Sequence, residues 1–157
     1  MQKIISGGQT GVDRAALDAA LECGFPAGGW CPKGRKAEDG KIPAFYPLKE
    51  LSSGDYRKRT LQNVIDSDGT LIIYFGQLTG GTELTRCYCS REKKPCLLID
   101  AEALDLSRAM RKSLNFLKSE SINILNVAGP RASSSAFAYP YTKELLSRIC
   151  SKLQHKT

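Results

Sequence analysis

The run Leu71-Ile72-Ile73-Tyr74-Phe75 constrains the fold more than any other part of the sequence. It is apolar without alternation, which is typical of a strand that is covered on both faces. Such strands belong to parallel sheets, whose crossover connections place helices on either side. The run therefore predicts an α/β architecture, and the rest of the chain agrees with it.

Short apolar runs bounded by glycine or proline alternate with longer segments of helical period. The expected strands are Lys3 to Ser6, Ala27 to Cys31, Thr70 to Phe75, Cys96 to Asp100 and Asn123 to Ala128. The expected helices are Val12 to Cys23, Tyr56 to Ile65, Thr82 to Lys93, Leu106 to Ser119 and Tyr141 to Leu153. The 157 residues predict a single domain, residues 1–157, built as a Rossmann-like open parallel sheet of about five strands with helices on both faces. Residues 32–54 show little helical or strand period and form a long connection, which is usually functional or disordered.

The charge balance allows three kinds of partner and decides among them only weakly. The formal net charge of +7 suits nucleic acid, a membrane surface or a small anion. Much of the excess lies in segments of helical period, where a charged row is usually the solvated face. No nucleic-acid-binding signature accompanies it, and no apolar run approaches the roughly 20 residues that span a bilayer. We therefore expect neither nucleic acid nor a membrane as partner.

The cysteines and the single histidine limit the chemistry. Six cysteines need no pairing in a chain of this length, and the first three residues lead directly into an apolar run without room for a secretory signal. A cytoplasmic protein with reduced thiols is therefore expected. His155 lies in the C-terminal tail, so neither a Ser–His–Asp nor a Cys–His arrangement is predicted. We predict no catalytic residue and no metal site.

Four polar, glycine-bearing segments follow the predicted strands, at residues 6–14, 32–39, 76–85 and 129–135. In open α/β sheets ligands bind beyond the carboxyl ends of the strands, where such segments meet. The segment S-G-G-Q-T-G-V-D-R, from Ser6 to Arg14, joins a strand to a helix and so directs backbone N–H groups and the positive helix end at one spot. A phosphate or another oxyanion fits this arrangement. A tight turn with an Asp or Thr cap is the alternative.

The first glycine turn lacks the spacing of two known phosphate motifs. It matches neither G-x-G-x-x-G nor G-x-x-x-x-G-K-[ST], so neither NAD binding nor ATP hydrolysis is predicted. Gly80-Gly81-Thr82-Glu83 repeats the order of strand, glycine turn and helix. Two such turns on neighbouring strands would converge on one ligand.

Cationic residues in the other two segments suit an anionic ligand. Arg131 follows the fifth strand, and its forked donors suit phosphate or molybdate-like oxyanions. Lys33, Arg35 and Lys36 could close over the ligand as a basic lid, and Arg35 is the most favoured of the three because loop lysines are commonly solvated. The predicted ligand-binding residues are Gly7, Gly8, Gln9, Thr10, Gly11, Asp13, Arg14, Lys33, Arg35, Gly80, Gly81, Thr82, Glu83, Gly129, Arg131 and Ser133.

Further polar residues near these turns have two interpretations. Their carboxylates either orient a ribose or an amino group of the ligand, or pair with Arg14, Arg35 and Arg59. Spacing alone does not separate the two. The residues concerned are Asp13, Arg14, Glu38, Asp39, Arg59, Asn63, Asp66 and Asp68.

Seven segments together resemble the molybdenum carrier family, which is also described as a circularly permuted YpsA-like branch of the SLOG nucleotide-binding superfamily. They are S-G-G-Q-T-G-V-D-R-A-A-L-D at Ser6 to Asp18, G-G-W-C-P-K-G-R-K-A-E-D-G at Gly28 to Gly40, I-P-x-x-Y-P-L at Ile42 to Leu48, R-T-x-x-N-V at Arg59 to Val64, D-S-D-G-T-L at Asp66 to Leu71, G-G-T-x-L-T at Gly80 to Thr85 and N-V-A-G-P-R-x-S at Asn126 to Ser133. The resemblance covers nearly the whole chain. It implies a Rossmann-like fold, a homo-oligomer (dimer or tetramer) and a pocket at the glycine turns. It implies molybdenum cofactor as the ligand by analogy with the algal carrier, or a nucleotide-like phosphorylated ligand in the wider superfamily.

One departure from the superfamily pattern bears on catalysis. The phosphoribohydrolase relatives carry P-G-G-x-G-T-x-x-E, whose glutamate serves hydrolysis. Aligning Gly81-Thr82 with its G-T places Thr85 at the glutamate position, while Glu83 stands two positions early on another helix face. We therefore expect a binding or carrier protein. The alternatives are a hydrolase of nucleoside phosphates with Glu83, Glu38 or Asp13 as acid/base, and a nucleotide sensor.

Overall fold

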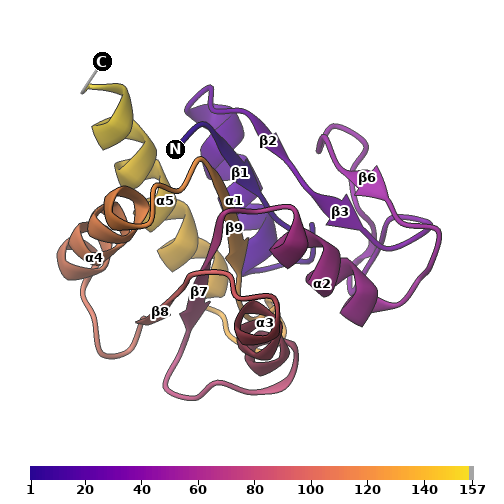
Figure 1. Cartoon of the computed structure of the whole chain (residues 1–157). Coiled ribbons are helices and arrows are strands. Elements are labelled where there is room, and N and C mark those ends of the chain that lie inside the picture. Colours follow the sequence, from indigo (N-terminus) through magenta and orange to yellow (C-terminus); the bar gives the residue numbers. More distant parts are fainter. Residues whose placement is uncertain (156–157) are drawn as a thin grey trace.

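The computed structural model describes residues 1–155 of the chain. Its centre is a five-stranded parallel sheet with the strand order β2-β1-β9-β7-β8 (Figure 1). The strands are β1 (Lys3–Ile5), β2 (Ala27–Gly28), β7 (Gly69–Tyr74), β8 (Cys96–Asp100) and β9 (Ile124–Ala128). β9 lies between β1 and β7, so the first and last of these strands along the chain are neighbours.

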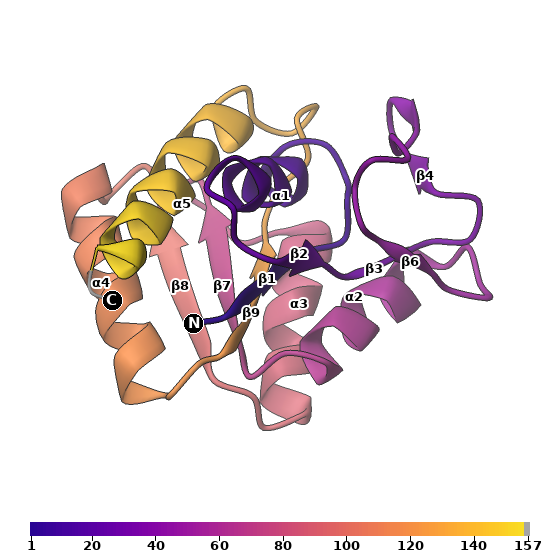
Figure 2. The same cartoon turned by 90° about the horizontal axis from the view of Figure 1, so that it is seen from above.

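Five helices cover both faces of this sheet. Helices α1 (Val12–Glu22), α4 (Leu106–Ser119) and α5 (Ala138–Gln154) lie on one face, and α2 (Tyr56–Ile65) and α3 (Gly80–Arg91) on the other (Figure 2). The predicted α/β fold with a five-stranded parallel sheet is confirmed. No helix within residues 1–155 is long and apolar enough to cross a membrane.

The core follows from the patterns noted in the sequence. Leu71, Ile72 and Ile73 in β7 are fully buried, as the unbroken apolar run predicts for a strand with helices on both sides. Small buried residues on α1, among them Ala16 and Ala20, let that helix lie close against α5 and the sheet.

Two predicted boundaries shift because of glycine and proline. The predicted strand Ala27 to Cys31 is broken at Gly29, whose φ of 126° lets its backbone pass Ser6. Only β2 joins the main sheet, while β3 (Trp30–Cys31) turns away from it. Helix α5 begins at Ala138 rather than Tyr141 because Pro140 lies in the first turn, where its missing N–H costs no hydrogen bond.

The connection from residue 32 to residue 54 carries more structure than predicted. Strand β3 pairs in parallel with β6 (Lys49–Glu50), and β4 (Lys36–Ala37) forms an antiparallel hairpin with β5 (Gly40–Lys41). These strands are two residues long, too short to produce a visible sequence period. The Lys36–Lys41 hairpin bends back over the start of α1, which matters for the site.

Candidate functional site

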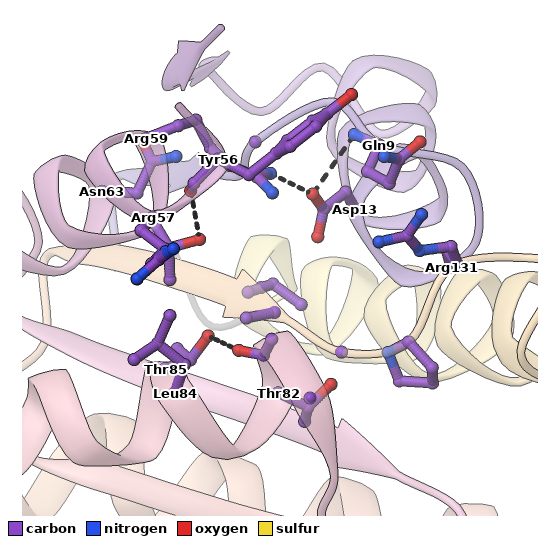
Figure 3. A pocket seen from close by; sticks show the side chains of 18 of the residues that line it. Gln9, Asp13, Tyr56, Arg57, Arg59, Asn63, Thr82, Leu84, Thr85 and Arg131 are labelled. Atoms are coloured by element: carbon purple, nitrogen blue, oxygen red, sulfur yellow. Dashed lines mark hydrogen bonds and ion pairs between the residues drawn. The ribbon is translucent and has the colours of Figure 1, made fainter. Parts of the chain in front are cut away.

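A cavity of about 410 Å³ opens at the carboxyl ends of β1, β9 and β7 (Figure 3). The chain leaving β1 enters α1 on one face of the sheet, whereas the chain leaving β7 enters α3 on the other. The two connections therefore separate, which is the arrangement in which open α/β sheets bind ligands. Helix α2 forms the remaining wall, and the volume suits a small ligand.

The first turn of α3 faces the open part of this cavity. Thr82 N and Glu83 N donate to Thr79 O at 3.2 and 3.3 Å. A Cβ atom added at Gly80 or Gly81 would meet nothing within 4 Å, so the backbone is exposed there. The N–H groups of Gly80 and Gly81 come before these first bonds of the helix and lie at its positive end, so this turn suits an anion.

The first glycine turn faces the protein itself instead. Val12 N donates to Pro130 O at 3.2 Å, so this N–H group at the start of α1 is already used. A Cβ atom on Gly11 would lie 2.5 Å from Pro130 O, and one on Gly7 would lie 1.6 Å from Arg59 Nη1. At these two positions glycine permits close contact with a loop and with a side chain.

A buried ion pair lies between the first glycine turn and α2. Arg59 Nη1 donates to Asp13 Oδ2 at 2.8 Å, and the two side chains are 13% and 8% exposed. Gln9 N also donates to this oxygen, at 3.2 Å. Burial raises the pKa of Asp13, and the charge and hydrogen bond of Arg59 oppose that rise. Of the two interpretations for Asp13, the structure shows pairing with arginine.

A second carboxylate, Glu38, connects three segments next to the cavity. It accepts hydrogen bonds from Thr10 Oγ1, from Ser133 N at 3.1 Å and from Ser133 Oγ at 2.5 Å. The Arg131 guanidinium lies 4.0 Å from it. We call Glu38 and these three partners the Glu38 clamp.

The Glu38 clamp should be sensitive to acid. Burial raises the pKa of Glu38, but the hydrogen bonds from Ser133 and Thr10 and the charge of Arg131 outweigh it, so the pKa lies below its ordinary 4.5. The ionised form is favoured by folding, and its stabilisation is complete above about pH 4.5 and disappears as the pH falls through the lowered pKa. Glu38→Gln should lower Tm by roughly 3–6 °C at pH 7. In differential scanning calorimetry this difference should shrink toward zero in acid, and a difference independent of pH would contradict the assignment.

Half of the predicted ligand-binding residues line the cavity. Arg131 lines it from the loop after β9 and is the cation of this set that reaches it. The lining residues of the predicted set are Gly7, Gln9, Asp13, Gly80, Gly81, Thr82, Gly129 and Arg131.

The other predicted residues lie outside the cavity. Arg35 does not form a lid, because its guanidinium donates to the carbonyl oxygens of Pro43 at 2.7 Å and of Tyr46 at 3.0 Å and so holds its own loop. Glu83 points away and pairs with Arg86 at 2.5 Å. The residues that do not line the cavity are Gly8, Thr10, Gly11, Arg14, Lys33, Arg35, Glu83 and Ser133.

Helix α2 contributes residues that the sequence reasoning missed. Tyr56, Arg57 and Thr60 line the cavity beside Arg59 and Asn63. The spacing 56, 59, 60, 63 places most of them on one helix face, and this polar face was the available signal. Asn63 is already used by the protein, since it exchanges hydrogen bonds of 2.8 and 3.0 Å with the Trp30 backbone.

Comparison with known proteins identifies the family. The sequence profile described as the circularly permutated YpsA SLOG family matches residues 4–150. The chain belongs to the circularly permutated YpsA SLOG family. It is also similar to a crystal structure from Syntrophus aciditrophicus described as "Putative molybdenum carrier protein", with a TM-score of 0.93 and 49% identity over 95% of this chain and 94% of that one. No curated protein matches the chain.

The helix α3 of this YpsA SLOG chain lacks a carboxylate aimed at the cavity. Thr85, which aligns in sequence with the glutamate of the hydrolase pattern, donates its Oγ1 hydrogen to Gly81 O at 2.8 Å. Thr85 is buried, and its hydroxyl stabilises the first turn of α3. Within the described lining, Asp13 is the carboxylate of the cavity.

Proposed function

We propose that this YpsA SLOG protein binds a small phosphate-bearing molecule in the cavity and carries it without altering it chemically. The observation that carries the proposal is the open first turn of α3 at Gly80-Gly81 in the same cavity as three arginines, Arg57, Arg59 and Arg131. Arg59 is paired with Asp13, and Arg131 lies 4.0 Å from the Glu38 carboxylate, so three guanidinium groups and two carboxylates leave one positive charge. A phosphate monoester is an anion of about −1.5 to −2 charges at neutral pH, and Arg57, Arg131 and the turn of α3 offer it donors.

The name of the similar structure directs the proposal to molybdenum cofactor as cargo. The donors in the cavity suit the phosphate and oxo groups of such a molecule. No cysteine lines the cavity within residues 1–155, and no group of three or more His, Cys, Asp or Glu side chains there could hold a metal ion. The protein would therefore hold the cofactor through its phosphate, with no protein ligand on the metal. A nucleotide would be held by the same phosphate contacts.

Gly81→Val tests the assignment of the phosphate position. A side chain there fills space that is otherwise open, so the fold should tolerate it while the ligand loses access to the N–H groups. We expect at least a tenfold loss of affinity, about 1.4 kcal/mol, with an unchanged Tm of the free protein. The measurement is isothermal titration calorimetry with phosphate, molybdate, AMP and purified molybdenum cofactor. Gly54→Val is the matched control, since Gly54 has equally open surroundings and lies outside the cavity.

A carrier leaves its ligand unchanged, whereas a hydrolase would release a free base from a nucleoside phosphate. Asp13 is the carboxylate that a hydrolase mechanism would have to use, and its ion pair with Arg59 occupies the oxygen Oδ2. Incubation with nucleoside monophosphates followed by chromatography should therefore release no free base. Base release that Asp13→Asn abolishes would replace the carrier proposal with an enzyme.

The resemblance to the molybdenum carrier family extends the proposal to the oligomeric state of the protein and to its place in the cell. We infer a dimer or tetramer acting in the cytoplasm. Sedimentation equilibrium of the purified protein tests the assembly, and a monomer at micromolar concentration would contradict it.

A further inference from the structure

The Glu38 clamp places a carboxylate of the chain itself among donors that suit a ligand anion. Glu38 sits at the tip of the Lys36–Lys41 hairpin, far in sequence from Ser133. Its two oxygens receive three hydrogen bonds and the nearby charge of Arg131. Hydroxyl, backbone N–H and guanidinium donors of this kind are those that bind phosphate in proteins. In this structure a protein carboxylate occupies donors of that kind.

The clamp adjoins the cavity through Arg131, which belongs to both, and through Gln9, a lining residue that contacts Glu38. Arg131 lines the cavity and also lies 4.0 Å from the Glu38 carboxylate. Gln9 lines the cavity, and its Oε1 accepts a hydrogen bond of 2.9 Å from Glu38 N. An anionic group that extends from the cavity past Arg131 would therefore reach the donors of the clamp.

The hairpin that delivers Glu38 is weakly held. Each of its strands has two residues, and Lys36 stands directly opposite Lys41, a like-charge pair that destabilises the hairpin. Both lysines are exposed. Apart from the clamp, the tip is held by the Gln9 contact and by the pair of Arg14 with the exposed Asp39. Ala37 packs against the buried cluster of Leu17, Cys31, Ile42 and Tyr46, so the displacement concerns the polar tip residues Glu38 and Asp39.

We propose that the donors around Glu38 form a second anion subsite, which a further anionic group of the ligand occupies by displacing the Glu38 carboxylate. The ligand class is a small molecule with two anionic groups, such as a nucleoside diphosphate. Phosphate brings more charge and one more acceptor oxygen than a carboxylate, so it competes well for these donors. The phosphate position at the first turn of α3 rests on the proposed function, whereas the second subsite around Glu38 is argued from its own contacts.

Removing the internal carboxylate should create a measurable site. The probe is inorganic phosphate, titrated by calorimetry into the wild-type protein, Glu38→Ala and Glu38→Gln. At phosphate concentrations too low to displace Glu38 in wild type, both variants should bind one more equivalent of phosphate per chain than wild type does. Asp39→Asn is the matched control, because it loosens the same hairpin but leaves the Glu38 carboxylate to compete with phosphate, so it should gain less phosphate binding than the Glu38 variants do. In wild type, saturating phosphate should accelerate hydrogen exchange of residues 36–41.

The outcomes separate this proposal from the carrier proposal. Unchanged stoichiometry in both Glu38 variants, or an equal gain in Asp39→Asn, would overturn the second subsite. Unchanged exchange of the hairpin under saturating phosphate would overturn displacement. The double variant Glu38→Ala, Gly81→Val should still bind one phosphate at the second subsite, while the phosphate position at α3 in the cavity loses its phosphate. An extra equivalent in Glu38→Ala without any phosphate binding by wild type would support the second subsite and count against the carrier proposal.

Discussion

Arg59→Met should lower the free energy of unfolding by about 3–5 kcal/mol, because it leaves the buried Asp13 carboxylate without its partner. Asp13 is 8% exposed and Arg59 13% exposed, so water replaces little of the lost interaction. For a protein of this length such a change corresponds to a fall in Tm of roughly 10 °C. Differential scanning calorimetry on the ligand-free protein measures it.

The destabilisation by Arg59→Met should depend on pH. Burial raises the pKa of Asp13 above its ordinary 3.8 while Arg59 opposes the rise, so removing Arg59 raises it further. The unfolded chain then ionises first as the pH increases. The loss of unfolding free energy in Arg59→Met is therefore small below about pH 3.8. It grows with increasing pH until the pH has passed the raised pKa of Asp13. Adding Asp13→Asn to Arg59→Met should restore much of the stability at pH 7, and no recovery would contradict the buried-charge explanation.

Gly11→Ala should be the most damaging of the small substitutions in the glycine turns. Gly11 has φ 78° and ψ −126°, a conformation that side chains oppose. An added Cβ would also meet Pro130 O at 2.5 Å and Ala132 N at 2.7 Å, and these backbone atoms move only with their loop. We expect a loss of roughly 2–5 kcal/mol from strain and overpacking, measured by urea denaturation.

Gly24→Ala separates the conformational part of that loss from the steric part. Gly24 has a comparable φ of 69° but nothing within 4 Å of an added Cβ, so it should cost only about 1–2 kcal/mol. Because Gly11 contacts the loop that carries Arg131, its substitution should also weaken phosphate binding, whereas Gly24→Ala should not. Equal losses of stability in the two variants would show that the contact with Pro130 is unimportant.

The sequence predicted the sheet because a strand that is buried on both faces appears in the sequence as an unbroken apolar run. Leu71, Ile72 and Ile73 of the long apolar run are fully buried, and helices α2 and α4 begin and end at the predicted residues. The prediction was wrong where elements are short. Strands of two residues, such as β4 and β5, have no period to read, and Gly29 breaks a run that looks continuous in the sequence.

The candidate site was predicted in part, for a physical reason. Glycine marks backbone that must be free of a Cβ atom, but the sequence does not say what takes the space. At Gly81 the space is open cavity, whereas at Gly7 it holds the Arg59 guanidinium. Side-chain partners over long sequence separations, such as Glu38 with Ser133, depend on the fold and were equally out of reach.

The position of β9 has a consequence for synthesis of the chain. β9 joins two strand pairs, β2 with β1 and β7 with β8, that share no other edge. Until Ile124–Ala128 has left the ribosome, a nascent chain carries two separate half-sheets with open edges at β1 and β7, and such edges are prone to wrong pairing. Production of the native protein therefore depends on an event late in translation, and ribosome-bound fragments that stop before Ile124 should be protease-sensitive and dependent on chaperones.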